Sequence, residues 1–597
     1  MLGKWVSVGV AFACALALAT QAAASLVPGD YAAGKLAATH ARATAAQAGA
    51  NGLVAKNFEV LGHHDLGLSE SNGDVWVHGN FAYVGTWSDP CNGRGVKIVD
   101  VTDLANPQLI GTLAAREGTS AEDMVVRSVS TPDFTGDLMG VGIQRCGDDP
   151  ALDTQQFGLE LWDVTNPAAP VQLSELGLTN GGGGVHELDL FQRGGNVYAL
   201  VATPFSEWFD PVPGGDFRII DVTNPNLPVQ VSEWGAGANG FSRGPFWGQG
   251  SFGASFDHSA RASADGMKAY VSYWDLGVLT FDISDVTNPV LLSRTRYRPS
   301  ADGDAHGMTP YEAGGRDFIL QNDEDFDPTT PAKILFRGGQ GIGPESAGSS
   351  PLWLEPRHRV RARVVTAANQ GCDVADYPAN TAGKIVVVRT LFPFFDPGFD
   401  PATSEQPLCE QQVQEAAAEA AGARAVVHDF IAEATSPQWF DFGSVAIPVL
   451  FTDHESATGM VAAGRATLQA RRPSWGFLRV FDAESGRQVA KFDRAPNVHA
   501  LPPPEGFWSI HNTEVDGDRA YSSWYTNGVV ALNLRPLSRR NVGDPRMVGQ
   551  FVPEAAPGAF PEVWGVVIRP SDRVIFVSDL GSGLWIVRAT GRAAPSD

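Results

Sequence analysis

The sequence predicts a mainly β fold, a seven-bladed β-propeller with an inserted α/β domain, and three observations lead to this prediction. First, a strand–turn–strand unit, clearest at residues 96–113, occurs seven times. Second, another hairpin precedes each unit, so that every repeat holds the four antiparallel strands of one blade. Third, the units recur at roughly 50 to 60 residues, except for one interval that is about 140 residues too long, which is the size of a domain.

The repeat unit ends its first strand on side chains that favour a turn. At residues 96–113 a β-branched run leads to Asp100 and Thr102, which can hydrogen-bond their own backbone, and Asn106-Pro107 bends the chain back. The other copies lie at residues 161–167, 219–225, 280–284, 479–482, 531–534 and 584–588. With Asp-Val-Thr-Asn-Pro as their most specific element, these copies resemble the LVIVD-repeat family of extracellular propeller proteins.

The preceding hairpins supply the first two strands of each blade. The clearest is residues 75–86, with Gly79-Asn80 at the turn, and residues 261–272 and 509–523 repeat it. The last repeat has no fourth strand of its own, whereas residues 58–66 are similar to the fourth strand of the other repeats. We therefore expect residues 58–66 to complete the last blade and to leave no open sheet edge.

The chain begins with a segment that is typical of a secretory signal peptide. Residues 1–25 contain Lys4, an apolar stretch and the small residues Ala22-Ala-Ala24. The apolar stretch is shorter than the roughly 20 residues that a membrane span requires, so we expect no membrane span after signal cleavage. The protein is therefore expected to be secreted, or to lie at the cell surface.

The remaining boundaries follow from the repeats and from local composition. We expect an Ala-rich spacer at residues 26–56 and the first part of the propeller at residues 57–337. A Gly- and Ser-rich linker is expected at residues 338–355, the inserted domain at residues 356–472 and the second part of the propeller at residues 473–590.

Four cysteines remain after the signal peptide, and they allow three pairings. Cys91 and Cys146 follow the second strands of adjacent blades and hence lie on one face, while Cys372 and Cys409 both lie in the insert. We therefore expect the disulfides Cys91–Cys146 and Cys372–Cys409, which fit an oxidising compartment.

The insert alternates strand and helix signals. Residues 383–389 form a buried apolar run, residues 409–421 lack Gly and Pro and favour a helix, and residues 425–428 and 447–451 indicate further strands. This order, with Gly-Lys-Ile-Val-Val-Val-Arg and Ile-Pro-Val-Leu, resembles the protease-associated (PA) domain. The resemblance implies a non-catalytic module that governs access or binds a partner. The chain departs from the family at residues 390–408, a loop rich in Phe and Pro that is either a binding tip or locally packed.

Polar residues stand just before the first strand of several blades. Blades three to six have a histidine there, blade two a glutamate, blade seven Trp564 and blade one a residue near Gly73; the polar set is Glu122, His186, His258, His306 and His511. Because first strands line the central channel, we expect these side chains to meet at one channel mouth. Neutral imidazoles with a carboxylate suit a divalent transition metal such as Zn, Fe, Cu or Mn. The other interpretation is a repeat consensus, in which each histidine caps its strand by hydrogen-bonding the neighbouring blade.

The acidic run at residues 322–327 is a second candidate site. Oxygen-rich clusters suit Ca²⁺, but the spacing is not that of a calcium loop, so we expect a solvated surface. The loop between strands two and three of a blade lies on the face where the first strand begins. We therefore expect the insert in blade five to stand over the channel mouth.

These features favour a binding or scaffold protein outside the cell, with a protein, peptide or glycan ligand. The alternative is a metal-dependent hydrolase or oxidoreductase with its site at the histidine-lined mouth. A formal net charge of −24 opposes contact with phosphate, so nucleic acid is not an expected partner. No Gly-x-Ser-x-Gly nucleophile motif is present.

Overall fold

The computed structural model describes residues 52–596 with several internal gaps. The gaps are residues 68–70, 88–90, 92, 148–149, 181–182, 211–212, 243, 245–253, 298–300, 302, 326–331, 344, 346–348, 392–406, 431–444, 472–473, 501–503 and 557–558. The expected signal peptide, nearly all of the expected spacer and most of the Phe- and Pro-rich loop lie outside the described residues. None of the helices in the described part is long and apolar enough to cross a bilayer.

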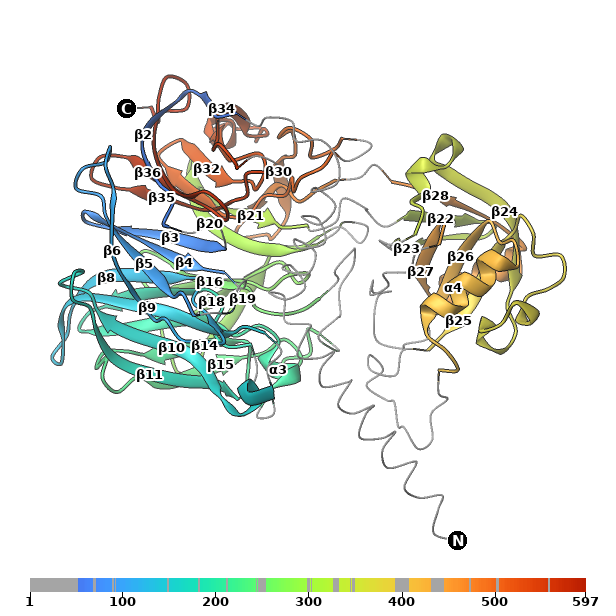
Figure 1. Cartoon of the computed structure of the whole chain (residues 1–597), viewed down its shortest axis with the longest axis horizontal. Coiled ribbons are helices and arrows are strands. Elements are labelled where there is room, and N and C mark those ends of the chain that lie inside the picture. The colour runs from blue at the N-terminus through green and yellow to red at the C-terminus, as the bar shows by residue number, and fades with distance from the viewer. Residues whose placement is uncertain are drawn as a thin grey trace, which may run out of the picture.

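Seven antiparallel sheets form the blades of a propeller, and each has at least four strands (Figure 1). Blade one consists of β3 (Asn72–His78), β4 (Phe81–Thr86), β5 (Val96–Asp100) and β6 (Gln108–Leu113). Blade two consists of β7 (Thr119–Ser120), β8 (Met124–Ser130), β9 (Thr135–Arg145), β10 (Gln156–Asp163) and β11 (Val171–Asn180). Blade three consists of β12 (Leu188–Arg193), β13 (Asn196–Ala202), β14 (Phe217–Asp221) and β15 (Val229–Trp234). The short helix α3 (Ser206–Phe209) lies between β13 and β14.

The later blades repeat this order. Blade four consists of β16 (Ser259–Ala262), β17 (Lys268–Ser272), β18 (Val278–Asp282) and β19 (Val290–Arg294), and blade five of β20 (Ala305–Ala313), β21 (Arg316–Asp323), β29 (Leu478–Asp482) and β30 (Gln488–Phe492). Blade six consists of β31 (Thr513–Asp516), β32 (Arg519–Ser523), β33 (Val529–Asn533) and β34 (Arg546–Val552). Blade seven contains β35 (Val563–Arg569), β36 (Val574–Asp579) and β37 (Gly583–Ala589). Contacts between consecutive first strands run from β3 through β8, β12, β16, β20, β31 and β35 back to β3, so the ring is closed. The prediction of seven blades is confirmed.

The repeat unit folds as its residues predict. Val96, Ile98 and Val99 of β5 are buried, and the strand ends where Asp100 accepts a hydrogen bond from the Thr102 amide at 2.9 Å. Asp163, Asp221 and Asp282 accept the equivalent amide hydrogen bonds in blades two to four. A register shift in the pairing of the third and fourth strands recurs just before these aspartates, between Ile98 and Val99 in blade one. Large apolar side chains then fill the space between neighbouring blades, as where Trp234 packs on Phe281 at 5.1 Å.

The N-terminal strand closes the ring as expected. β2 (Phe58–His64) pairs with β37, so that blade seven has the order β2-β37-β36-β35. The expected spacer, however, includes a strand that the sequence analysis did not predict. β1 (Val54–Lys56) pairs with β34 as a fifth strand of blade six, because the outer edge of β34 has free backbone groups beside the incoming chain.

The chain between β21 and β29 forms a separate mixed sheet with the order β23-β22-β28-β24-β25-β26-β27, drawn beside the propeller in Figure 1. Its elements are β22 (Ala332–Phe336), β23 (Gly339–Gly343), β24 (Arg359–Thr366), β25 (Ile385–Thr390), α4 (Gln411–Ala420), β26 (Ala425–Phe430), β27 (Val449–Asp453), α5 (His454–Ala463) and β28 (Arg465–Gln469). Short 3-10 turns also occur, at Pro150–Thr154 and Arg535–Ser538 in the propeller and at Leu352–Leu354, Pro356–His358, Asn369–Gly371 and Val374–Asp376 in the insert.

The expected boundary of the insert differs from the observed one. Residues 332–336, assigned to the propeller, and residues 339–343, assigned to the linker, form a hairpin that belongs to the sheet of the insert. Gly338 at its turn has a φ of +97°, which a side chain would disfavour, and β22 gains a second partner in β28. A Gly-rich composition therefore indicated a linker where a hairpin stands.

Both expected disulfides are confirmed. Cys91–Cys146 joins the loops that follow β4 and β9 in blades one and two, with a Cα–Cα distance of 5.4 Å. Cys372–Cys409 lies within the insert, where it joins the turn before β25 to the start of α4, with a Cα–Cα distance of 5.9 Å. These links fit an oxidising compartment.

Candidate metal centre

The beginnings of the first strands bring the predicted histidines together on the propeller axis. The ring centroids of His186 and His258 lie 4.2 Å apart, those of His258 and His306 3.9 Å, and those of His306 and His511 4.1 Å. All four side chains are buried. Since they come from four consecutive blades, their meeting is a consequence of the ring and not of sequence proximity.

Blades seven, one and two complete the circle. Trp564 lies 4.4 Å from His511 between ring centroids, and its indole Nε1 donates to Glu122 Oε1 at 2.8 Å. The other oxygen of Glu122 lies 2.8 Å from His186 Nδ1. Blade one contributes Gly73, and a Cβ atom there would lie 2.9 Å from Glu122 Cγ. Because Gly73 has no side chain, there is room for the Glu122 carboxylate to lie between Trp564 and His186.

Two of the outer imidazole nitrogens have acceptors. His186 Nδ1 lies 3.2 Å from Gln144 Oε1 and 2.8 Å from Glu122 Oε2, and His511 Nδ1 lies 2.9 Å from the carbonyl oxygen of Trp564. His258 Nδ1 lies 3.6 Å from Glu187 Oε1, which is too far for a hydrogen bond, and His306 Nδ1 has no hydrogen-bond partner among the described residues. A nitrogen that donates to such a partner leaves the other nitrogen with a free lone pair, which is how metal-binding histidines are usually held.

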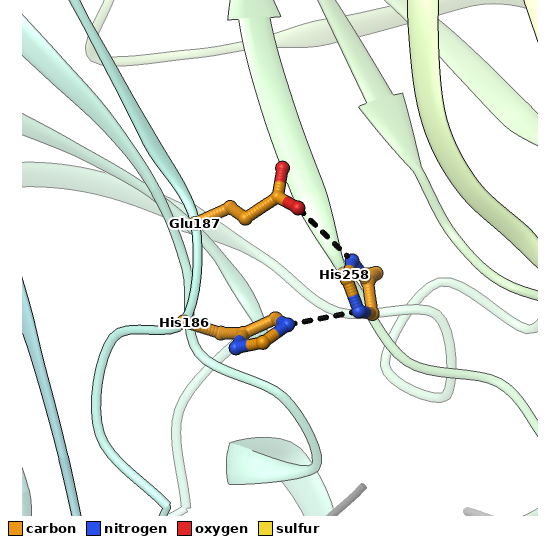
Figure 2. Close-up of side chains that lie close together, drawn as sticks. All are labelled: His186, Glu187 and His258. Atoms are coloured by element: carbon orange, nitrogen blue, oxygen red, sulfur yellow. Dashed lines mark hydrogen bonds and ion pairs between the residues drawn. The ribbon is translucent and has the colours of Figure 1, made fainter. Parts of the chain in front are cut away.

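The inner nitrogens of His186 and His258 face each other. Their Nε2 atoms are 2.8 Å apart, while Glu187 reaches the far side of the His258 ring (Figure 2). Two nitrogens that are each about 2.1 Å from one ion and stand at a right angle would be roughly 3 Å apart. The observed spacing is therefore close to that of two adjacent ligands on one ion. Without an ion, one nitrogen donates to the other.

Glu324 is a site residue that the sequence analysis missed. Its carboxylate oxygens lie 3.7 Å from His306 Nε2 and 3.9 Å from His511 Nε2, and Tyr525 donates its hydroxyl hydrogen bond to the same group. The expectation of a solvated surface at residues 322–325 is wrong, because all four side chains are buried. β21 ends on the same face of the ring as the histidines, and Glu324, the first residue after it, reaches His306 and His511. The last two residues of the acidic run, 326 and 327, lie outside the described residues.

Burial favours the uncharged forms of three of the histidines and of two nearby glutamates when no ion is present. Desolvation and the neighbouring imidazoles lower the pKa of His258 and His306 well below the usual range, and burial lowers the pKa of His511 to about 3. Desolvation also raises the pKa of Glu187 and Glu324 well above the usual range. A positive ion would reverse the carboxylate shifts and accept the neutral imidazole lone pairs.

Two overlapping groups have mutually close ligand atoms. His186, Glu187 and His258 form one, and His258, His306 and Glu324 form the other, with all ligand atoms of a group within 4.8 Å of one another. His258 belongs to both, which places it at the middle of the candidate centre. Glu122 is close to His186 but contacts its outer nitrogen, so its place is behind the ligand set.

The fold and the repeats agree with a comparison against protein families. The model described as the LVIVD repeat matches residues 71–114 and 263–296, which are blade one and most of blade four. The chain is thus a seven-bladed β-propeller with LVIVD repeats. Leucine aminopeptidase 2 from Trichophyton rubrum is similar over a short segment, 43% identical over 47 residues, which covers 8% of this chain and 10% of that protein.

Similarity to solved structures is low. A zinc aminopeptidase from Bacillus subtilis superposes with a TM-score of 0.20 and 20% identity, over 28% of this chain and 36% of that one. A computationally designed protein superposes with a TM-score of 0.35 and 8% identity, over 89% of this chain and 99% of that one. TM-scores of this size support no statement about activity.

Proposed function

We propose that this protein is an exported β-propeller that holds a divalent transition-metal ion on its axis through His186, His258, His306 and His511. The insert, on this proposal, is a PA domain that governs access to the centre, since β21 and β29 connect it to the face on which the histidines lie. The signal-peptide pattern and the two disulfides support export.

The observation that carries the proposal is the orientation of the imidazoles. His186 places Nδ1 near Glu122 and Gln144, and His511 places Nδ1 on the Trp564 carbonyl oxygen. The ligand atoms of His258, His306 and Glu324 all lie within 4.8 Å of one another. A repeat consensus predicts the same backbone hydrogen bond in every blade, whereas the partners differ between blades: His511 Nδ1 lies 2.9 Å from the Trp564 carbonyl oxygen, and His186 Nδ1 lies 3.2 Å from the side-chain oxygen of Gln144. Neutral nitrogens with nearby carboxylates suit Zn, Fe, Cu or Mn. An ion held this way supplies Lewis-acid or oxygen chemistry if a coordination position stays open.

A metal-free binding or scaffold module is the second candidate. The contact of His186 Nε2 with His258 Nε2 favours it, because one shared proton satisfies both nitrogens without an ion. The ligand would then be a protein, peptide or glycan.

Elemental analysis of the purified protein separates the two candidates. We expect about one equivalent of a transition metal per chain, and loss of that metal in the double variant His258→Ala/His306→Ala. The variant His454→Ala is the matched control, because this side chain is 62% exposed in the insert. A folded wild-type protein that takes up no Zn, Fe, Cu or Mn on dialysis contradicts the metal proposal and leaves the binding module. Circular dichroism checks that each variant is folded.

A further inference from the structure

Blades four and six share a turn that directly follows the second strand. The turn spans residues 273–277 in blade four and residues 524–528 in blade six. Its backbone hydrogen bonds are the same in both blades, at 2.7 to 2.9 Å: the first amide donates to the fifth carbonyl oxygen, the fourth amide to the first carbonyl oxygen, and the fifth amide to the second. Each turn ends on a glycine with a positive φ. The two turns are therefore copies of one local structure.

The second residue of each turn is a large aromatic residue in an unfavourable conformation. Trp274 has a φ of +42° and Tyr525 a φ of +36°, values that bulky residues rarely adopt. Such strain persists only where the surrounding structure enforces it, and it is concentrated at functional sites. Each ring contacts the histidine at the start of its own blade, with ring centroids 5.5 Å apart for Trp274 and His258 and 5.4 Å apart for Tyr525 and His511. The strained turn thus holds an aromatic ring against an imidazole of the candidate centre.

Tyr525 carries a hydroxyl group in addition, and this group reaches blade five. It donates a hydrogen bond to Oε1 of Glu324, the first residue after β21. Tyr525 is 0% exposed and Glu324 is 2% exposed, so bulk water does not compete for this bond. Phe507 and Trp564 pack nearly perpendicular to the tyrosine ring, with ring centroids 4.4 and 5.7 Å away. Packing and the strained turn therefore fix the position of the hydroxyl group.

The other carboxylate oxygen of Glu324 faces the histidines. Oε2 lies 3.7 Å from His306 Nε2. Two ligand atoms that are each about 2.1 Å from one ion, at a tetrahedral angle, would be roughly 3.4 Å apart. The observed spacing is close to this value. A carboxylate whose Oε1 is held by Tyr525 therefore presents Oε2 where an ion bound to His306 would need it.

We propose that Glu324 is a carboxylate ligand of the ion and that Tyr525 is the positioning residue that holds it. This inference rests on the proposed function and adds one ligand to the four histidines. Tyr525 acts through Glu324, as the hydrogen-bond partners of metal ligands generally do. Loss of such a partner weakens metal binding by about 10- to 100-fold.

Titration of the metal-free protein with Co²⁺ tests this proposal, because the visible absorption of this ion reports the geometry of its ligands. We expect Tyr525→Phe, which keeps the ring and removes the hydroxyl group, to raise the Kd by about 10- to 100-fold and to change the absorption spectrum. Tyr521→Phe is the matched control. Tyr521 is 1% exposed in the same blade, and its hydroxyl group donates to the Ala593 carbonyl oxygen at 2.8 Å. This control also loses a buried hydrogen bond, yet it should bind Co²⁺ as the wild type does.

A double-mutant cycle separates positioning from general damage to the fold. Glu324→Ala should itself weaken Co²⁺ binding and change the spectrum. With Glu324→Ala present, Tyr525→Phe should alter the Kd by less than about twofold, because the group that it positions is gone. Circular dichroism checks each variant, and Glu324→Met, which keeps most of the side-chain volume, replaces Glu324→Ala if the latter unfolds.

The outcomes distinguish this inference from the proposed function. Wild-type affinity and spectrum in Tyr525→Phe or in Glu324→Ala overturn the inference and leave the metal proposal intact. Equal losses in Tyr521→Phe and Tyr525→Phe also overturn it, as does a full effect of Tyr525→Phe in the absence of Glu324. A folded wild-type protein that binds no Co²⁺ contradicts the proposed function, and this inference fails with it.

Discussion

At the scale of single residues, Lys97 shows how a buried charge can report on stability. Its side chain is 2% exposed in β5 of blade one, and its ammonium donates to the carbonyl oxygen of Gly85 and to Thr86 Oγ1, both at 2.9 Å. Desolvation, with a smaller contribution from Arg94, lowers its pKa from 10.5 to about 7. The folded protein therefore binds this proton less tightly than the unfolded chain does.

This shift predicts a pH dependence of stability. Between pH 7 and 10 the unfolded chain holds a proton at residue 97 that the folded chain has released, so the free energy of unfolding rises with pH. We expect the free energy of unfolding of the wild type, minus that of Lys97→Met, to increase by up to about 1.4 kcal/mol per pH unit across this range. Urea unfolding at several pH values measures it. Lys268→Met, at an exposed position, is the control, and a flat wild-type-minus-Lys97→Met difference contradicts the prediction.

At the scale of secondary-structure elements, β2 holds the ring together. It is the outermost strand of blade seven, yet it comes from the start of the propeller in the sequence. Phe58, at its first position, is 6% exposed and reaches into blade six, with ring centroids 6.3 Å from both Tyr521 and Phe551. The strand therefore joins blades six and seven through its side chains as well as closing one sheet.

Truncation of this side chain should weaken the closure. We expect Phe58→Ala to lower the free energy of unfolding by about 3 to 5 kcal/mol, because a buried aromatic group is lost and a cavity remains. The neighbouring Glu59→Ala should change it by less than about 1 kcal/mol, since Glu59 takes part only in an exposed ion pair with Arg588. Chemical denaturation measures both variants. A loss for Phe58→Ala as small as that for Glu59→Ala would show that β2 does not close the ring in solution.

At the scale of the whole molecule, the candidate metal ligands tie together blades that are distant in sequence. In the sequence His186 and His511 are separated by three blades and the insert, yet they are linked around the axis through His258 and His306. An ion bound to all four histidines should therefore stabilise the ring as a unit.

Metal removal tests this consequence. At free metal one hundred times the dissociation constant, binding to the folded state adds about 2.7 kcal/mol to the free energy of unfolding. We expect EDTA to lower the urea midpoint of wild type accordingly and to leave His258→Ala/His306→Ala unchanged. Tryptophan fluorescence follows the transition. If the wild-type protein has the same urea midpoint with stoichiometric metal as after EDTA treatment, the histidines of the folded propeller do not bind the metal.

Much of the molecule follows from local sequence. The Asp100 and Thr102 pattern predicts the strand end because it depends on residues close in the chain, and the repeat count predicts seven blades. Residues 58–66 predict the closing strand because they are similar to the fourth strands of the other repeats, although β2 pairs with β37 near the other end of the chain. Local patterns gave wrong predictions where the same composition is compatible with two different structures. A Gly-rich run at residues 339–343 forms a strand, and an acidic run at residues 322–325 is buried.

By itself the sequence determined the repeat, the ring and the positions of the four histidines along their strands, since periodicity and turn residues specify these locally. Only the tertiary structure decided that the imidazoles stand 3.9 to 4.2 Å apart, that Gly73 makes room for Glu122, and that Glu324 lies near the axis. These depend on how seven sheets tilt and pack, which sets distances between residues hundreds of positions apart.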